Sequence, residues 1–572
     1  MKHIILFSIL ASLAISPLGA ASITQGQALE VAQQFMSQRQ AHRMPSQAAS
    51  PLHLVCKGQA ASGCVDYYVF NRGSGAGFVV VSGDDRALPV LGYSTDGAFD
   101  ADSVPENMRW WLEGYQQQIE WLRNHPDAAP RQAQQLTSSV DPLLDTRWNQ
   151  GAPYNNLCPA IEGTSSGRAW TGCVATATAQ IMKYHRWPNR GRASHSYYWS
   201  GGADGPIELS ADFSQSQYQW DDMANLYGYD GYGTIYSRES VNEEWDYATQ
   251  AQQDAISQLM SDVGIALNMN YGAGGSGTGS HYVLPALRAY FDYDASMQYL
   301  VRTDYENNGG DWDALLRSEL DAARPIYYSG SNSNAGHAFV FDGYDTNGYF
   351  HINWGWGGSS DGYFASTVLN PSDQGAGSSE GGYNSGQMAV IGIQPATEPT
   401  ACLSLVRDVE AQADVMPAND VRAIAEFEAV GGDFNDYVML WVTTPELQVL
   451  DYQYMLVELK EGEKKTFTYR STIDANEGDV CYLVLHNPYY WDYGYIWGGI
   501  ASFVVGDWVT PPDVTGDVTG DGKVDVSDVN AVINIILGNK TEADYPGNAD
   551  LTGEGKTDVS DVNAIINIIL KL

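Results

Sequence analysis

The spacing of hydrophobic and polar residues changes several times along the 572-residue chain, and each change indicates a different kind of element. Near the start, an apolar run from Ile4 to Ile15 follows Lys2 and His3. This run is too short to span a bilayer but suits the apolar part of an export signal. We therefore predict a signal peptide over residues 1–21 and a secreted mature protein. No later run reaches the length of about 18 apolar residues that a membrane span needs.

Residues 22–139 combine two periods. The alternating apolar segment 77–81 predicts a strand. Apolar residues three or four positions apart predict an amphipathic helix; they are Met108, Leu112, Tyr115, Ile119 and Leu122. The stretch 125–139 has two prolines, small residues and no apolar period, which is typical of a linker. We expect a small domain followed by a linker that a protease can cut.

The remaining chain divides into three zones. Residues 140–395 are rich in Trp, Tyr, Gly and Asn, with a helix signal after Gly172 and strand signals near Phe339 and Phe350. Residues 396–509 contain short alternating runs separated by turn residues, which predicts an all-β sandwich. Residues 510–572 form a separate tail with an internal repeat.

Composition narrows the function classes. The chain has 69 acidic and 30 basic residues, a net charge of −39 and a pI near 4.3, which argues against a nucleic-acid partner. Its six cysteines include no CxxC pair, so neither a disulfide scaffold nor a structural zinc site is predicted. In an oxidising compartment two pairs could bridge, although the sequence does not fix the connectivity: Cys56 with Cys64, and Cys402 with Cys481.

The tail repeat has the spacing of a calcium loop. DVTGDGKVDVSD begins at Asp517, and DLTGEGKTDVSD begins at Asp550. Each places oxygen-bearing side chains at positions 1, 3, 5, 9 and 12, a glycine at position 6 and a backbone carbonyl at position 7. We predict two structural calcium ions, with these ligands: Asp517, Thr519, Asp521, Lys523, Asp525 and Asp528 in the first loop, and Asp550, Thr552, Glu554, Lys556, Asp558 and Asp561 in the second.

The segment from Asp517 to Leu572 resembles dockerin type I modules, because position 12 is Asp and one apolar helix follows each loop. It departs from the usual pattern at Thr519, Thr552 and Glu554, where Asn or Asp is commoner. The resemblance implies a small α-helical calcium-binding domain that binds a cohesin module on a scaffold or cell surface.

A candidate nucleophile lies in the central zone. The segment 171–180 (TGCVATATAQ) passes from a glycine into an Ala-rich helix-forming run that ends before Pro188. Cys173 is therefore predicted at a helix N-terminus, where backbone N–H groups favour the thiolate over the thiol. A lone cysteine is more often a buried small hydrophobe, so the assignment requires partner residues.

A predicted hairpin supplies those partners. Residues 337–342 and 349–354 alternate as strands on either side of a turn that begins at Asp345. Because His337 and Asn353 are equally far from Asp345, a hairpin centred there places their side chains opposite each other on one face. A histidine base held by an amide is the arrangement that a thiol nucleophile needs.

Other histidines compete for the role of base. His185 lies twelve residues beyond Cys173, or about 18 Å along a continuous helix. His351 is expected to be structural or exposed, and His281, beside a glycine-rich loop, is a weaker alternative. An oxyanion needs donors as well, and the candidates are the backbone N–H of Cys173 and the side-chain amide of Gln150.

Four segments together resemble the streptopain family of cysteine peptidases within the papain-like clan: WNQGAPYN (148–155), TGCVATATAQIMKYHRWP (171–188), GHAFVFDGYD (336–345) and FHINWGWGG (350–358). The resemblance extends over residues 22–394. It implies an α+β papain-like catalytic domain that needs no cofactor, preceded by an α+β inhibitory pro-domain. It also implies these roles: Cys173 as nucleophile, His337 as general base and acid, Asn353 as orienter, Gln150 as oxyanion donor, Trp354 as a shield for the His–Asn contact, and Gly336 and Gly277 as walls of the substrate cleft.

The sequence thus predicts a multidomain secreted zymogen that hydrolyses proteins or peptides and is inhibited by its own pro-domain. The expected domains are a signal peptide (1–21), a pro-domain (22–139), a peptidase domain (140–395), a β-sandwich accessory domain (396–509) and a dockerin (510–572). Two alternatives remain: a non-catalytic surface-binding protein built on a papain-like scaffold, and a transpeptidase that uses the same acyl-enzyme.

Overall fold

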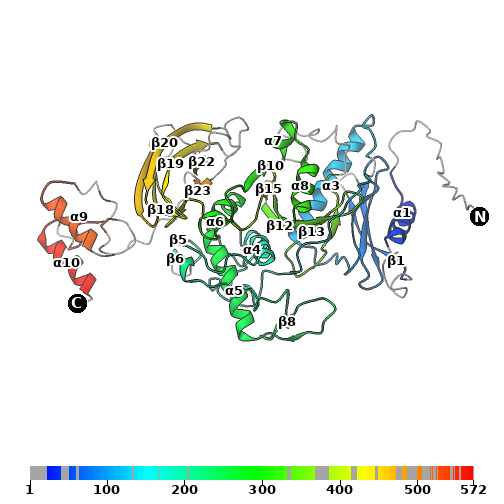
Figure 1. Cartoon of the computed structure of the whole chain (residues 1–572), viewed down its shortest axis with the longest axis horizontal. Coiled ribbons are helices and arrows are strands. Elements are labelled where there is room, and N and C mark those ends of the chain that lie inside the picture. Colours follow the sequence, from blue (N-terminus) through cyan, green and yellow to red (C-terminus); the bar gives the residue numbers. More distant parts are fainter. Residues whose placement is uncertain are drawn as a thin grey trace, which may run out of the picture. The chain divides into compact units, whose positions relative to one another are not determined.

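The structure is a computed structural model that describes residues 22–39, 50–59, 63–131, 134–164, 166–202, 205–331, 336–367, 386–413, 421–444, 449–471, 479–485, 499–504 and, with short gaps, 516–570. The predicted signal peptide lies outside the described residues. Within them, no helix combines the length and the apolar character that a membrane crossing requires. The chain divides into two compact units (Figure 1). The first contains residues 1–149 and 300–392, and the second contains residues 150–299 and 393–572.

A ten-stranded sheet forms the centre of the first unit, in the order β1-β2-β3-β4-β14-β13-β12-β11-β15-β10. Its strands from the N-terminal region are β1 (Leu52–Gln59), β2 (Val65–Arg72), β3 (Phe78–Ser82) and β4 (Val90–Ser94). The others are β10 (Gln298–Val301), β11 (Ile326–Ser331), β12 (Gly336–Tyr344), β13 (Phe350–Asn353), β14 (Gly362–Phe364) and β15 (Gln387–Ile391). The N-terminal strands join the rest through β4 and β14, which pair in antiparallel fashion.

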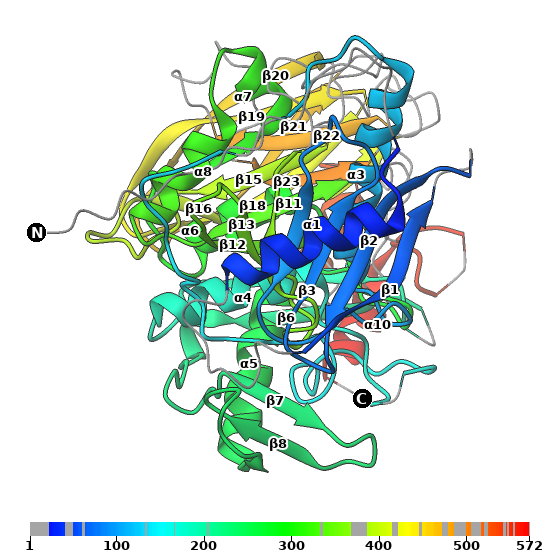
Figure 2. The same cartoon turned by 90° about the vertical axis from the view of Figure 1, so that its right-hand side faces the viewer.

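Four helices belong to this unit: α1 (Gln25–Gln38), α3 (Glu106–Asn124), α7 (Arg302–Asn307) and α8 (Trp312–Asp321). Thr24 and Gln27 form a capping box that starts α1, and Figure 2 shows this helix lying across β2 and β3. The apolar period predicted for residues 108–122 is confirmed, because all five of its residues are buried on one side of α3. That side packs against β2 and β12.

The second unit begins with helices and small sheets. Its helices are α4 (Cys173–His185), α5 (Gln250–Ala266) and α6 (Val283–Ala289), with 3-10 turns at Phe213–Gln215 and Ser280–Tyr282. Strands β5 (Ser194–Trp199) and β6 (Ile207–Asp212) form one hairpin, and β7 (Leu226–Tyr229), β8 (Ile235–Arg238) and β9 (Asp246–Tyr247) form a second sheet. Helix α4 packs against α5 and is almost completely buried from Val174 to Met182.

Two four-stranded antiparallel sheets follow in the same unit. One contains β16 (Cys402–Leu405), β17 (Glu410–Ala413), β18 (Val421–Val430) and β21 (Lys464–Ser471). The other contains β19 (Phe434–Thr443), β20 (Val449–Leu459), β22 (Val480–Leu485) and β23 (Gly499–Val504). Alternate residues of β18 are buried, and side chains from both sheets, such as Phe427 and Leu440, form one hydrophobic core. We call residues 402–504 the β-sheet module.

The tail folds around two helices, α9 (Val526–Ile536) and α10 (Val559–Leu570), one after each predicted calcium loop. Buried side chains from both repeats share a small core, which includes Val518, Val532 and Ile565. The repeat is therefore a structural repeat as well as a sequence repeat.

The cysteines form no disulfides. None of the six, each within the described residues, is part of a disulfide. Cys402 Sγ lies 3.6 Å from Arg192 Nη2 and 3.7 Å from the carbonyl oxygen of Arg288, whereas Cys481 is buried in the core of the β-sheet module. Neither the Cys56–Cys64 nor the Cys402–Cys481 bridge that the sequence allowed is present. In the second pair, the two thiols lie in different surroundings.

Candidate active site

The candidate nucleophile begins a helix, as predicted. Cys173 is the first residue of α4 and is half-buried. The preceding residue, Gly172, has a φ of 88°, which an L side chain rarely adopts. A Cβ added to Gly172 would lie 2.8 Å from Met269 Sδ and 2.9 Å from the carbonyl oxygen of Ser276. Glycine is therefore required here both for its backbone angle and for its small volume.

Two other sequence candidates lie near the entry to α4. The backbone N–H of Thr171 donates to the carbonyl oxygen of Gln150 at 3.1 Å, so Gln150 is held beside the segment that leads to Cys173. The Gln150 side chain is only 5% exposed. Gly277 exchanges two backbone hydrogen bonds with Asn270, at 3.0 and 3.1 Å.

The glycine-rich loop, residues 272–280, is tied to the same segment by side chains. Ser276 Oγ donates to the carbonyl oxygen of Trp170 at 2.6 Å. In return, Trp170 Nε1 donates to the carbonyl oxygen of Ala273 at 2.8 Å. The loop and the start of α4 therefore form one hydrogen-bonded assembly within the second unit.

The candidate base lies in the first unit. His337 is half-buried near the start of β12, beside the exposed Gly336. Burial lowers the pKa of His337, and the carboxylate of Glu106 partly opposes this effect. The imidazole faces the Trp110 indole of α3, with 6.5 Å between the ring centroids.

The hairpin register predicted for His337 and Asn353 is wrong. Asn353 pairs with Val340 of β12, three positions from His337. Asp345 Oδ1 accepts the backbone N–H groups of Asn347 and Tyr349, so the turn is centred beyond Asp345. An irregularity between Phe341 and Gly343 shifts the register further. Equal distance along the chain did not account for either effect.

Asn353 itself is buried and held by the backbone. Its Nδ2 donates to the carbonyl oxygen of Thr146 at 2.8 Å, and its Oδ1 accepts the N–H of Gly355 at 3.0 Å. The next residue, Trp354, is fully buried and donates through Nε1 to the carbonyl oxygen of Ser360 at 3.1 Å.

Helix α3 covers the strands that carry these residues. Asn107 is 1% exposed, and its Nδ2 donates to the carbonyl oxygens of Ala338, at 3.2 Å, and Trp354, at 2.6 Å. A Cβ on Gly330 would lie 1.9 Å from the Trp110 ring, so β11 accepts this indole only where it has a glycine. The start of α3 thus contacts the residues that follow both His337 and Asn353.

The competing histidines have structural surroundings. Helix α4 continues to His185, so the whole helix separates this residue from Cys173. Burial lowers the pKa of His185 to about 4. His351 Nδ1 lies 2.6 Å from Asp342 Oδ1, which confirms a structural role. Burial also lowers the pKa of His281 to about 4, and its ring packs against Tyr282 and Tyr482.

The sequence analysis did not identify two buried carboxylates that support β12 and β13, which we call the histidine strands because they carry His337 and His351. Asp342 holds His351, and Asp361 Oδ1 accepts the backbone N–H of Trp354 at 3.0 Å. Burial raises the pKa of Asp361 to about 6. Asp342 could have been found from the sequence, because it directly follows the apolar run 338–341 of a predicted strand. No sequence pattern marked Asp361.

The two tail loops are organised in the same way where they are described. Asp528 Oδ1 accepts the N–H and the hydroxyl of Thr519, each at 2.9 Å. Asp561 Oδ1 accepts the same groups of Thr552, at 2.9 and 3.0 Å. Asp550 Oδ2 accepts the N–H of Gly555, and Asp558 pairs with the Lys556 ammonium. The other candidate ligands lie outside the described residues: Asp517, Asp521, Lys523, Asp525 and Glu554.

Three regions of the chain match known families. Residues 148–364 match the Peptidase C10 family, residues 20–119 match the Spi protease inhibitor family, and residues 515–570 match the dockerin type I domain. Streptopain of Streptococcus pyogenes is 41% identical over 341 residues, which are 57% of this chain and 80% of streptopain. The chain belongs to the Peptidase C10 family.

Two further relatives agree with this C10 assignment. The thiol protease/hemagglutinin PrtT of Porphyromonas gingivalis is 36% identical over 411 residues, which cover 69% of this chain and 45% of PrtT. A solved fragment of Prevotella intermedia prointerpain A is 31% identical with a TM-score of 0.50, and the match covers 61% of this chain and 100% of the fragment. This C10 protein is therefore a cysteine peptidase with an inhibitor-like pro-domain and a dockerin type I domain.

Proposed function

We propose that this C10 peptidase is a secreted zymogen whose processed form is an endopeptidase with Cys173 as its nucleophile. The Cys173 thiolate attacks a peptide carbonyl, and His337 gives a proton to the leaving amine. Water, deprotonated by His337, then hydrolyses the thioester and regenerates the thiol. Asn353 orients the imidazole, and the Cys173 N–H and the Gln150 amide stabilise the oxyanion.

The local geometry at Cys173 is the observation that supports this assignment best. A required glycine delivers Cys173 to the first turn of a buried helix, where the helix dipole favours a thiolate. By contrast, burial raises the pKa of Cys158 to about 12, so this thiol is a poor nucleophile at neutral pH. The backbone carbonyl of Gln150 accepts the N–H of Thr171, two residues before Cys173, which supports a position for the Gln150 amide near the nucleophile.

The pro-domain, residues 22–139, inhibits in our proposal by covering the histidine strands. Trp110 lies beside the His337 ring, and Asn107 donates to the backbone carbonyl oxygens of Ala338 and Trp354. In this proposal Gly336 and Gly277 contribute to walls of the substrate cleft, and Trp354 shields the contact between His337 and Asn353. Cleavage in the linker over residues 125–139 releases the inhibition.

The peptidase domain, residues 140–395, is followed in this proposal by a β-sandwich accessory domain (396–509) and a dockerin (510–572). The described loop carboxylates fit calcium, since they are hard oxygen donors arranged alike in the two repeats. We assign one calcium ion to each loop. The dockerin then attaches the exported enzyme to a cohesin module on a scaffold or cell surface.

Casein hydrolysis by the processed full-length chain tests the catalytic assignment. Cys173→Ala should lower the rate at least about 1,000-fold, because the nucleophile is lost. Cys158→Ala is the matched control, and it should retain activity if its melting temperature is preserved. Equal rates for wild type and Cys173→Ala would favour a non-catalytic surface-binding protein, and capture of the acyl group by added amines in place of water would favour a transpeptidase.

A further inference from the structure

A polar junction in the second unit joins the β-sheet module to β5 of the peptidase region. The backbone N–H of Ser196 donates to the carbonyl oxygen of Val406 at 3.2 Å. The N–H of Asp408 donates in turn to the carbonyl oxygen of Ser196 at 2.7 Å. The segment between β16 and β17 is therefore held to the backbone of β5 at Ser196, and it carries the Asp408 side chain with it.

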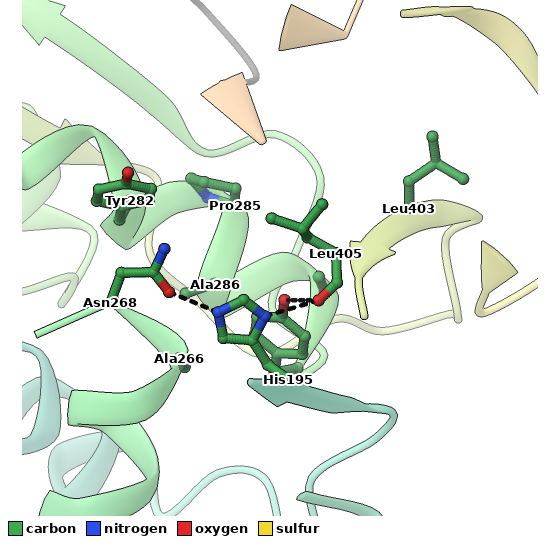
Figure 3. Close-up of a pocket in the computed structure, with 10 residues that line it drawn as sticks. His195, Ala266, Asn268, Tyr282, Pro285, Ala286, Leu403 and Leu405 are labelled. Carbon is green, nitrogen blue, oxygen red and sulfur yellow. Dashed lines mark hydrogen bonds between the residues drawn. The ribbon is translucent and has the colours of Figure 1, made fainter. Parts of the chain in front are cut away.

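His195, one residue before Ser196, lies at the centre of the junction. Its ring is 3% exposed, with Nδ1 2.8 Å from the carbonyl oxygen of Leu405 and Nε2 2.5 Å from Asn268 Oδ1 (Figure 3). The Tyr290 hydroxyl donates to the same Leu405 oxygen at 2.7 Å. These residues line a small pocket, and the polar groups of His195, Asn268, Tyr290 and Leu405 are hydrogen bonded to one another there. We therefore interpret the pocket as a structural junction.

Asn268 is held at both ends of its amide. Its Oδ1 faces His195, and its Nδ2 donates to Asp408 Oδ1 at 3.1 Å. Asn268 has a φ of 51°, in the left-handed region that asparagine tolerates better than most residues. Its backbone conformation and its side chain are therefore both fixed, and the β-sheet module supplies one of the two anchors.

The residues that follow Asn268 lead directly to the candidate site. Met269 packs beneath Gly172, the residue before Cys173. Asn270 exchanges backbone hydrogen bonds with Gly277 in the glycine-rich loop. Thr278 Oγ1 closes the loop by donating to the carbonyl oxygen of Leu267 at 2.6 Å. We therefore expect a movement of Asn268 to displace the glycine-rich loop.

We propose that Asp408 is a positioning residue for peptide hydrolysis, because it holds the glycine-rich loop in place through Asn268. The β-sheet module then contributes to peptidase activity and does more than connect the peptidase domain to the dockerin. The inference rests on the proposed function, in which the glycine-rich loop forms one wall of the substrate cleft.

Two substitutions of Asp408 in the processed full-length chain test the proposal. Asp408→Ala removes the acceptor for Asn268, whereas Asp408→Asn keeps an oxygen that can accept the same hydrogen bond. We expect Asp408→Ala to raise KM for a peptide substrate at least about fivefold with a smaller fall in kcat, since the cleft wall is displaced while the nucleophile remains. Asp408→Asn should restore KM to within about twofold of wild type.

Alkylation of Cys173 by iodoacetamide separates positioning from general damage. This small reagent does not need the cleft wall, so its rate with Asp408→Ala should stay within about twofold of wild type. Asp433→Ala, which removes an exposed carboxylate paired with Lys460 on the same module, is the matched control and should leave KM unchanged.

Three results would overturn the inference: an unchanged KM in Asp408→Ala, no rescue by Asp408→Asn, or a parallel loss of hydrolysis, alkylation and melting temperature. Failure of the proposed function looks different, because wild type itself would then show no hydrolysis that depends on Cys173.

Discussion

The two halves of the candidate site reach their geometry by different routes. Cys173 is placed by local features: Gly172, the helix that begins at Cys173, and a loop tied to the same segment. His337 and Asn353 are placed by a strand register that depends on a turn and an irregularity several residues away. The position of Cys173 is therefore sensitive to substitution of single backbone positions. The positions of His337 and Asn353 depend instead on how whole strands pair and which helix covers them.

Gly172→Ala should have the largest effect on activity, because it changes the residue that positions Cys173. The added methyl group meets Met269 Sδ and the Ser276 carbonyl oxygen at a φ of 88°. We expect about 1–3 kcal/mol of destabilisation and a fall in kcat/KM of about 100-fold from displacement of the nucleophile. Gly228→Ala, outside the candidate site, is the control, since a Cβ on Gly228 would meet only the Trp245 ring at an ordinary 3.5 Å. Similar kinetics for the two variants would contradict local placement.

Asn107→Ala should give the next largest effect, on latency. It removes the hydrogen bonds to the carbonyl oxygens of Ala338 and Trp354, which lie beside the two histidine-strand candidates. A loss of about 1.5–3 kcal/mol in pro-domain binding corresponds to about 10- to 150-fold weaker inhibition. Residual activity of the uncleaved zymogen measures the effect. Gln117→Ala, on the exposed side of α3, should leave latency intact, and an equal rise in both variants would count against the covering role of α3.

The stability of the folded protein should depend on pH through His351 of β13. Burial alone would lower the pKa of this imidazole, but the adjacent Asp342 carboxylate outweighs it and raises the pKa in the folded state. A raised folded-state pKa stabilises the protein at pH below the unfolded value of about 6.5, and that contribution is lost as pH rises through the folded value. The stability difference between wild type and His351→Gln should therefore be larger near pH 5.5 than near pH 9. A larger difference at the alkaline end would reverse the sign and refute the pairing.

Calcium removal should have the smallest effect on catalysis. Chelation should unfold the tail loops, because like charges then lie close together without a cation. Peptide hydrolysis by the processed chain should change less than about twofold, since no catalytic candidate lies in the tail. Calorimetry with and without chelator, beside the kinetics, checks both statements. An unfolding temperature of the tail that is the same with and without calcium would contradict the assignment of the loops as calcium sites.

This contrast explains what the sequence could predict. The helix start at Cys173, the amphipathic α3 and the helix after each tail loop all follow from patterns within about ten residues, and each was predicted correctly. The pairing of Asn353 with Val340 was not predicted, because turn chemistry at Asp345 and a strand irregularity decide it. The junction at His195, Asn268 and Asp408 was also missed, since three segments far apart in the chain build it.

In the proposed function, the Cys173 thiol and the His337 imidazole act as one catalytic pair. A crystal structure of the processed full-length enzyme tests it most directly, through the distance from Cys173 Sγ to the nearer ring nitrogen of His337. We predict a separation within about 4 Å, close enough for proton transfer after modest adjustment. A distance of more than about 7 Å to both ring nitrogens would contradict the account, because no proton could then pass between the two groups.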